Sequence, residues 1–235
     1  MSVIKKQLIG MLLSGLMLVM LLSGCGPKVY NNGTYIGVST ADDNGYAVAE
    51  VTVKDDKIVD VKLTEFNARA QEKDMETYQW EAAREAFRQL PGRFVGRQDA
   101  NIETYSGATA SSNKYITAVS FALEKARKTP QVTTQYFDGT FMGRSDADDK
   151  GYGIAFVTIE KDQIKSVRLL EVTSEDQFKD YATYPYTTVL EAKEALEKAF
   201  VEKNSPEVDT YSGATNSSQK WIQAVSNALQ AAKLK

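Results

Sequence analysis

The sequence predicts an α+β protein with two tandem homologous domains, each a mainly antiparallel sheet packed with helices. Two observations predict this fold class. The first is an internal repeat: Gly33-Thr34-Tyr35 matches Gly139-Thr140-Phe141, and the six residues 104–109 recur unchanged as 210–215. The second is the order of patterns in each repeat, where an alternating hairpin is followed by helical stretches.

The two copies keep a constant offset of 106 residues, from Gly33 to Gly139 and from Thr109 to Thr215. A repeat of this length indicates a duplicated domain, because solenoid units run about 20–50 residues. We place the first domain at residues 33–127 and the second at residues 139–235. The segment 128–138 contains Pro130 with several Thr and Gln residues and is typical of a linker.

A β-hairpin is expected near the start of each domain. Residues 47–53 alternate small or apolar side chains with polar ones, Asp55-Asp56 supplies a turn, and a second strand begins near Ile58. Helices are expected near residues 75–90 and 181–200, and again after the repeated motif. The later helices each carry one apolar stripe at spacings of three and four. Its residues are Ile116, Val119, Leu123 and Ala126, then Ile222, Val225, Leu229 and Ala232.

The composition excludes several function classes. Hydrophobic residues make up 43% of the 235, charged residues 25%, and the net charge is −3. An acidic chain without a Lys/Arg-rich tract is not expected to bind nucleic acid. The chain has no His and a single Cys, which excludes a CxxCH haem site, a Cys-ligated iron–sulfur cluster, the usual zinc sites, and Ser-His-Asp and Cys-His catalysis. Redox chemistry would therefore need an organic cofactor.

The N-terminus has the pattern of a lipoprotein signal peptide. Lys5 and Lys6 precede an uncharged run, residues 8–22, that is too short to span a membrane as a helix. The sequence Leu22-Ser23-Gly24-Cys25 then resembles a bacterial lipobox, which implies cleavage after residue 24 and lipidation of Cys25. Residues 25–32 would form a lipidated tether to the bilayer. The alternative is a plain secretory signal with a chance cysteine.

The repeated motif lies just before the second helix of each domain. It comprises Ser106, Gly107, Ala108, Thr109, Ser111 and Ser112 in the first copy and Ser212, Gly213, Ala214, Thr215, Ser217 and Ser218 in the second. One interpretation is a helix-capping turn, because Ser and Thr are ordinary N-caps. The other is an anion site, because a helix N-terminus offers free N–H groups. A phosphate on the threonine would then meet those groups and the neighbouring serine hydroxyls.

This motif resembles that of the FMN-binding domain family, in which an Asp begins a D-x-x-S-G-A-T string. Asp209 gives the second copy the full pattern, whereas Glu103 replaces the Asp in the first. The resemblance implies two FMN groups, joined by phosphoester bonds to Thr109 and Thr215 by an FAD:protein FMN transferase. The Thr-Pro-Gly-rich loop of the ion-pump members is missing, so their partners are not carried over.

A lipobox followed by two such domains is similar to surface lipoproteins of flavin-based extracellular electron transfer in Gram-positive bacteria. This implies a carrier anchored on the extracytoplasmic face of the cell membrane. It would relay electrons from a quinone-linked donor to extracellular acceptors such as ferric iron, as an electron-transfer flavoprotein more than a stand-alone enzyme. The alternatives are an electron-donating partner of an extracellular reductase and a non-redox binding lipoprotein.

Other residues suggest weaker hypotheses. Tyr105 and Tyr211 beside the motif, and Tyr115 and Trp221 in the following helices, could stack on a flavin or pack in the core. The pairs Asp42-Asp43 and Asp148-Asp149 could bind Ca²⁺, although a solvated turn is the default interpretation.

Overall fold

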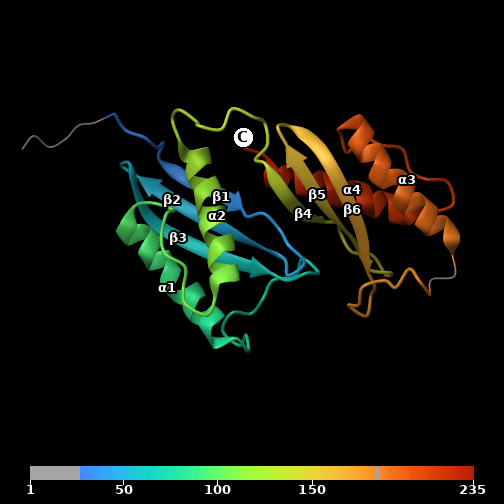
Figure 1. Cartoon of the computed structure of the whole chain (residues 1–235), viewed down its shortest axis with the longest axis horizontal. Helices are drawn as coiled ribbons and strands as arrows, with labels where there is room; N and C mark the ends of the chain where they lie inside the picture. Colours follow the sequence, from blue (N-terminus) through green and yellow to red (C-terminus); the bar gives the residue numbers. More distant parts are fainter. Residues whose placement is uncertain (1–26, 184–185) are drawn as a thin grey trace, which may run out of the picture.

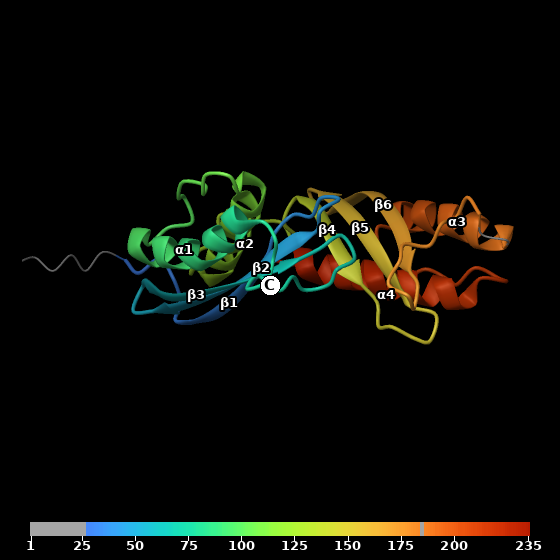
Figure 2. The same cartoon turned by 90° about the horizontal axis from the view of Figure 1, so that it is seen from below.

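The computed structural model describes residues 27–183 and 186–235. The expected signal peptide (1–24) and Cys25 lie outside this part. Figure 1 shows two similar α+β units side by side, and Figure 2 shows them following one another along the long axis of the molecule. The predicted fold class is therefore confirmed, with a three-stranded antiparallel sheet in each half.

The element order is the same in both domains. The first contains β1 (Gly33–Val38), β2 (Tyr46–Lys54), β3 (Lys57–Phe66), α1 (Glu81–Arg97) and α2 (Thr109–Ala126). The second contains β4 (Gly139–Arg144), β5 (Tyr152–Glu160), β6 (Gln163–Val172), α3 (Thr187–Lys203) and α4 (Thr215–Ala232). The strand orders are β1-β2-β3 and β4-β5-β6. In each domain the middle strand pairs with both neighbours, so the predicted hairpin is extended by an edge strand.

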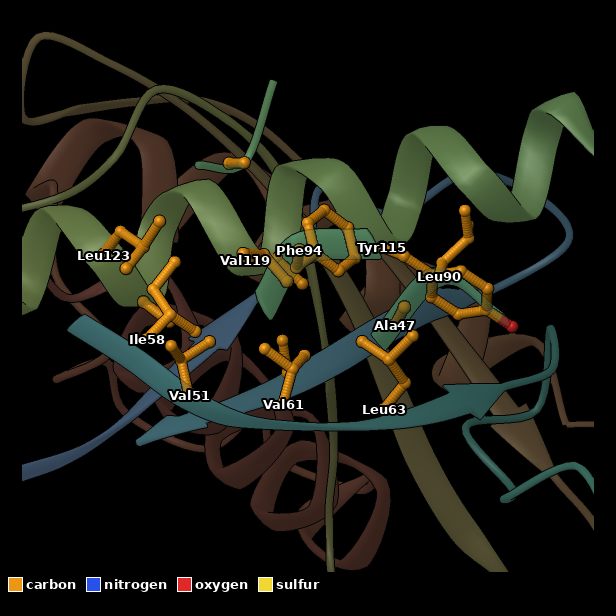
Figure 3. Packing of buried hydrophobic residues seen from close by; sticks show 14 of the residues in the cluster. Ala47, Val51, Ile58, Val61, Leu63, Leu90, Phe94, Tyr115, Val119 and Leu123 are labelled. Atoms are coloured by element: carbon orange, nitrogen blue, oxygen red, sulfur yellow. The ribbon is translucent and has the colours of Figure 1, made fainter. Parts of the chain in front are cut away.

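The core of the first domain lies between its sheet and its helices. Figure 3 shows Val51 and Val61 pointing from the strands toward Val119 and Leu123 of α2, and Leu63 pointing toward Tyr115 of the same helix. The apolar face of β2 thus packs against the apolar stripe of α2. The second domain repeats this core with its own sheet and helices.

A glycine in each edge strand allows α2 or α4 to lie close against the sheet. A Cβ atom on Gly37 would come within 1.9 Å of the Ala118 carbonyl oxygen, and one on Gly143 within 2.0 Å of that of Ala224. Any other residue would push the helix away from the strand. The edge strands were not expected from the sequence, because they are short and contain such glycines.

The hairpin turns agree with prediction, but the helix starts differ from it. Asp55 and Asp56 both have positive φ, 52° and 66°, as a two-residue type I′ turn requires. Helix α1 begins at Glu81 instead of near residue 75, because the Asp74 carboxylate accepts bonds from the Glu76 N–H and the Thr77 hydroxyl and holds a turn there.

Asp180 does the same before α3, which begins at Thr187 instead of near residue 181. At its other end α1 continues past Pro91 to Arg97. The reason is packing, because Leu90 and Phe94 extend one fully buried face across the proline.

The two domains contact each other through the outer face of the second sheet. Met142, Ile154 and Phe156 project from that face and form a buried cluster with Ala70, from the loop after β3. The Tyr152 hydroxyl donates to the Arg69 carbonyl at 2.9 Å. These contacts explain why β5 is buried on both faces, whereas β2 alternates between buried and partly exposed residues.

Candidate functional site

The repeated motif forms a tight turn that leads into α2 or α4. The Ala108 N–H donates to the Tyr105 carbonyl at 3.0 Å, and Gly107 has φ +79°. A Cβ on Gly107 would also come within 3.1 Å of the Ala82 side chain. The glycine is therefore needed for its left-handed backbone and for close packing on α1. Gly213, with φ +82°, repeats this geometry against Thr188.

The threonine of each motif is the first residue of its helix. The N-cap is Ala108 or Ala214, whose methyl side chain cannot cap, so the helix-capping interpretation of the threonine is wrong. The Ser112 N–H makes the first helical bond, to the Ala108 carbonyl. The N–H groups of the three residues before Ser112 therefore have no acceptor within the helix. Thr109 and Thr215 are both exposed beside such groups.

Ser112 and Ser218, which the sequence grouped with the binding residues, instead hold the turn from inside. The Ser112 hydroxyl is buried, donates to the Ala108 carbonyl at 2.8 Å and accepts from the Tyr105 N–H at 3.0 Å. Ser218 makes the matching bonds with Ala214 and Tyr211. A contact with a phosphate on the exposed threonine is therefore not supported for these two serines.

A buried carboxylate lies beneath the start of α2. Glu65, at the end of β3, accepts a bond from the Ser111 hydroxyl at 3.2 Å, from the Tyr115 hydroxyl at 2.5 Å and from the Lys73 ammonium at 2.6 Å. The ammonium compensates the carboxylate charge, and the helix N-terminus favours a negative group. Burial, together with this carboxylate, raises the pKa of Tyr115, so its hydroxyl remains a donor.

The second domain has a similar arrangement around Glu171, with the tyrosine donor coming from the loop before α3 and not from the helix. Its carboxylate accepts from the Ser217 hydroxyl at 2.9 Å, from the Lys179 ammonium at 2.7 Å and from the Tyr181 hydroxyl at 3.2 Å. Neither of these glutamates and neither of their lysines was predicted from the sequence. Glu65 shares the buried face of its strand with Val61 and Leu63, and it recurs 106 residues later, so both signals were present.

A second ion pair in each domain joins the loop between the first two strands to the helix that follows the motif. The Lys114 ammonium lies 2.7 Å from Asp42, and the Lys220 ammonium lies 2.6 Å from Asp148. The bond from Lys220 lowers the pKa of the Asp148 carboxyl. Among residues 27–183 and 186–235, no group of three or more His, Cys, Asp and Glu side chains is placed to hold a metal ion. The aspartate pairs therefore do not support a Ca²⁺ site.

A cavity of about 760 Å³ opens beside Thr215. Residues 171–175, 178–180 and 183, from the end of β6 and the segment after it, line this cavity together with the first residues of α3 and α4. Its polar lining includes Ser217, Lys179 and Lys220. This volume falls within the range of about 300–1,000 Å³ found for sites of small molecules and cofactors.

The four aromatic residues that the sequence offered as flavin contacts differ in exposure. Tyr115 and Trp221 are fully buried, and the Trp221 indole N–H donates to the Leu170 carbonyl, so stacking of these two on a flavin is wrong. Tyr105 lies beneath the Arg93 guanidinium and Tyr211 lies near Glu191.

The other polar residues of the motif lie on the surface of the turn. Ser106 and Ser212 are exposed, as are Glu103 and Asp209 three residues earlier. In the described part of the chain, no helix has the length and apolar character needed to cross a membrane.

Comparison with known proteins agrees with the resemblance of the motif. The family model of the FMN-binding domain matches residues 44–124 and 151–230, more than half of the chain. A crystal structure of the CPE2226 protein from Clostridium perfringens is 28% identical, with 41% of this chain and 88% of that chain covered and a TM-score of 0.36. Among curated proteins none matches. The chain belongs to the FMN-binding domain family, with one copy of the domain in each half.

Proposed function

We propose that the chain is a membrane-anchored electron carrier that holds two FMN groups covalently, through phosphoester bonds to Thr109 and Thr215. The proposal rests mainly on the position of each threonine, which is the exposed first residue of a helix. A phosphate on that hydroxyl would lie beside the free N–H groups and the positive end of the helix dipole.

The residues around the second motif suit the rest of the flavin group. The cavity beside Thr215 has the volume of a cofactor site, and Ser217 and Asn216 lie next to the attachment point. Its lining is mixed in charge, because the ammonium groups of Lys179 and Lys220 are paired with Glu171 and Asp148. The attraction for the phosphate therefore comes from the free N–H groups at the start of α4. When bound, FMN would supply the ability to accept and release one or two electrons, which no side chain of this chain offers.

Attachment is expected to need an external enzyme. A threonine hydroxyl is a weak nucleophile unless a base activates it, and the chain contains no His. We assign this step to an FAD:protein FMN transferase, which would form the bond from the threonine oxygen to the FMN phosphorus and release AMP. The exposure of both threonines supports access by such an enzyme.

The wider role rests on the N-terminal sequence. We assign Cys25 as the site of lipidation and place the domains on the extracytoplasmic face of the cell membrane. Two acyl chains hold a protein stably at a bilayer, where one chain holds it only marginally. A covalent cofactor suits this location, because a dissociable one would be lost by dilution. The proposed donor is a membrane quinol pool, and the proposed acceptors include ferric iron.

The test is the intact mass and in-gel flavin fluorescence of the full chain, expressed with an FMN transferase. Wild type is expected to gain two FMN masses, and Thr109→Ala and Thr215→Ala one each. Thr104→Ala and Thr210→Ala are matched controls, because these exposed threonines belong to the same six-residue strings. Both controls should keep two adducts.

The alternative outcomes separate the parts of the proposal. A single adduct that survives Thr109→Ala would mean that Glu103 prevents modification of the first domain, and Glu103→Asp should then restore it. A chain without any adduct would contradict the covalent carrier. It would leave a lipoprotein that binds FMN reversibly.

A further inference from the structure

Two of the most exposed large hydrophobic side chains of the described residues occupy matching positions. Trp80 is 62% exposed and Tyr186 is 65% exposed. They lie 106 residues apart, and each is the N-cap residue of the helix that packs beside the motif, α1 or α3. Single exposed apolar residues need no explanation, but a pair repeated at one structural position is informative.

Helix capping does not explain these two aromatic residues. N-caps are normally Ser, Thr, Asp or Asn, whose side-chain oxygen accepts a backbone bond. Neither Trp80 nor Tyr186 caps its helix through its side chain. Both have an extended backbone, with φ −84° and −102°. The chain therefore places an aromatic ring where a capping residue would stabilise the helix more.

The Trp80 ring contacts the attachment turn, and the Tyr186 ring lines the cavity that this turn borders in the second domain. The Trp80 indole N–H donates to the Gly107 carbonyl at 2.9 Å, two residues before Thr109. Tyr186 lines the cavity beside Thr215, together with Gly213 and Ala214. Each domain thus has one exposed ring next to the hydroxyl that would carry the flavin.

We propose that Trp80 and Tyr186 are the aromatic contacts of the two flavin rings, one in each domain. This inference rests on the proposed function, because it needs FMN at Thr109 and Thr215. A planar flavin and an aromatic side chain attract each other in an offset stack, and the contact removes apolar surface of both from water. The two sites differ, because the first offers an indole and the second a phenol.

A purely structural role is the competing explanation for Trp80. Its bond to the Gly107 carbonyl could hold the attachment turn in shape without touching the flavin. Trp80→Phe separates the two roles, because it removes the N–H donor and keeps a ring. Trp80→Ala removes both.

The experiment uses the full chain, loaded by the transferase, in two backgrounds that each hold one flavin. Thr215→Ala leaves the flavin at Thr109, and Thr109→Ala leaves the flavin at Thr215. Attached FMN is counted by intact mass, and the emission of the flavin and its quenching by iodide are measured per attached FMN. An indole stacked on a flavin quenches its emission by passing one electron to the excited ring and taking it back, with no net chemical change.

Trp80→Ala is expected to raise the emission and the iodide quenching of the flavin at Thr109. Tyr186→Ala should do the same at Thr215, and neither should act on the other site. Trp80→Phe should raise the emission but keep the protection from iodide. Unchanged emission and iodide quenching in loaded Trp80→Ala would overturn the inference, even if loading falls. A parent chain without FMN mass would instead overturn the proposed function.

Discussion

Replacing Glu171 with alanine should strongly destabilise the second domain. The Glu171 carboxylate is 2.7 Å from the Lys179 ammonium, and the two side chains are only 9% and 14% exposed. The same carboxylate accepts the Ser217 hydroxyl, which lies in the first turn of α4. The substitution therefore removes the counter-charge of a buried ammonium and a connection between β6 and the helix that carries Thr215.

The expected cost follows from the burial of the pair. Removing one partner of a buried ion pair costs about 3–5 kcal/mol, because the other charge stays buried without compensation. Lys179 retains some contact with solvent, so we take the lower end, about 3 kcal/mol. With an m value of about 1–2 kcal/mol per molar urea, the unfolding midpoint should fall by about 1.5–3 M.

Tryptophan fluorescence during urea unfolding measures this change in the second domain. The chain has two tryptophans, and only Trp221 of the second domain is fully buried, so its emission should report the unfolding of that domain. Lys179→Met combined with Glu171→Gln should recover most of the loss, since this double variant keeps a hydrogen-bond acceptor and removes both charges. A shift below about 0.5 kcal/mol for Glu171→Ala, as at an ordinary surface site, would refute the reasoning.

Two further predictions concern packing and pH. Gly143→Ala should lower the free energy of unfolding by about 1–3 kcal/mol, because its methyl group would meet the backbone of α4. Gly92→Ala in the interior of α1, with open space around it, should instead raise stability by about 0.5–1 kcal/mol; equal effects of the two would contradict the close approach. Burial raises the pKa of Tyr46 to about 12, so the folded chain keeps a proton that the unfolded chain releases near pH 10. The stability from this group is complete below pH 10 and falls by about 2–3 kcal/mol as the pH approaches 12. Tyr46→Phe should therefore flatten the alkaline end of a stability–pH profile, and an unchanged slope would exclude Tyr46 as its cause.

The sequence predicted the elements whose patterns are local. The alternation of residues 47–53 with the Asp55-Asp56 turn predicted the hairpin, and the stripe through Val119 and Leu123 predicted α2. Strand β1 was missed because six residues with two glycines give a weak pattern. The start of α1 was wrong because the bonds of Asp74 compete with helix formation, and helix propensity does not include such bonds.

The polar part of the site depended on contacts between distant residues. Glu65 and Ser111 lie 46 residues apart, and Lys114 and Asp42 lie 72 apart. Spacing along the chain does not bring such pairs together before the fold is known. The motif itself was predictable, because its residues are contiguous. Its serines were not, since Ser111 and Ser112 are neighbours in sequence but point to different partners.

The two domains have diverged where their surroundings differ. Glu50 of β2 makes an exposed ion pair with Lys62 at 3.3 Å. The matching residues of the second sheet are Phe156 and Arg168, which stack with ring and guanidinium 4.0 Å apart beneath the first domain. The face that is solvated in the first domain is thus an interface in the second, and the charged pair of the first corresponds to a pair of ring and guanidinium in the second.

Around the attachment turn the two domains have kept the same polar groups. Both copies keep the threonine, the left-handed glycine, the buried glutamate with its lysine, and the lysine–aspartate pair that ties the loop between the first two strands to the helix. The core beneath the turn did change, since the buried Tyr115 corresponds to the buried Trp221 and the donors to the glutamate are rearranged. If these polar groups served packing alone, they could differ between the domains as the core residues do. Their retention in two domains with different neighbours indicates that both turns serve the same chemical purpose.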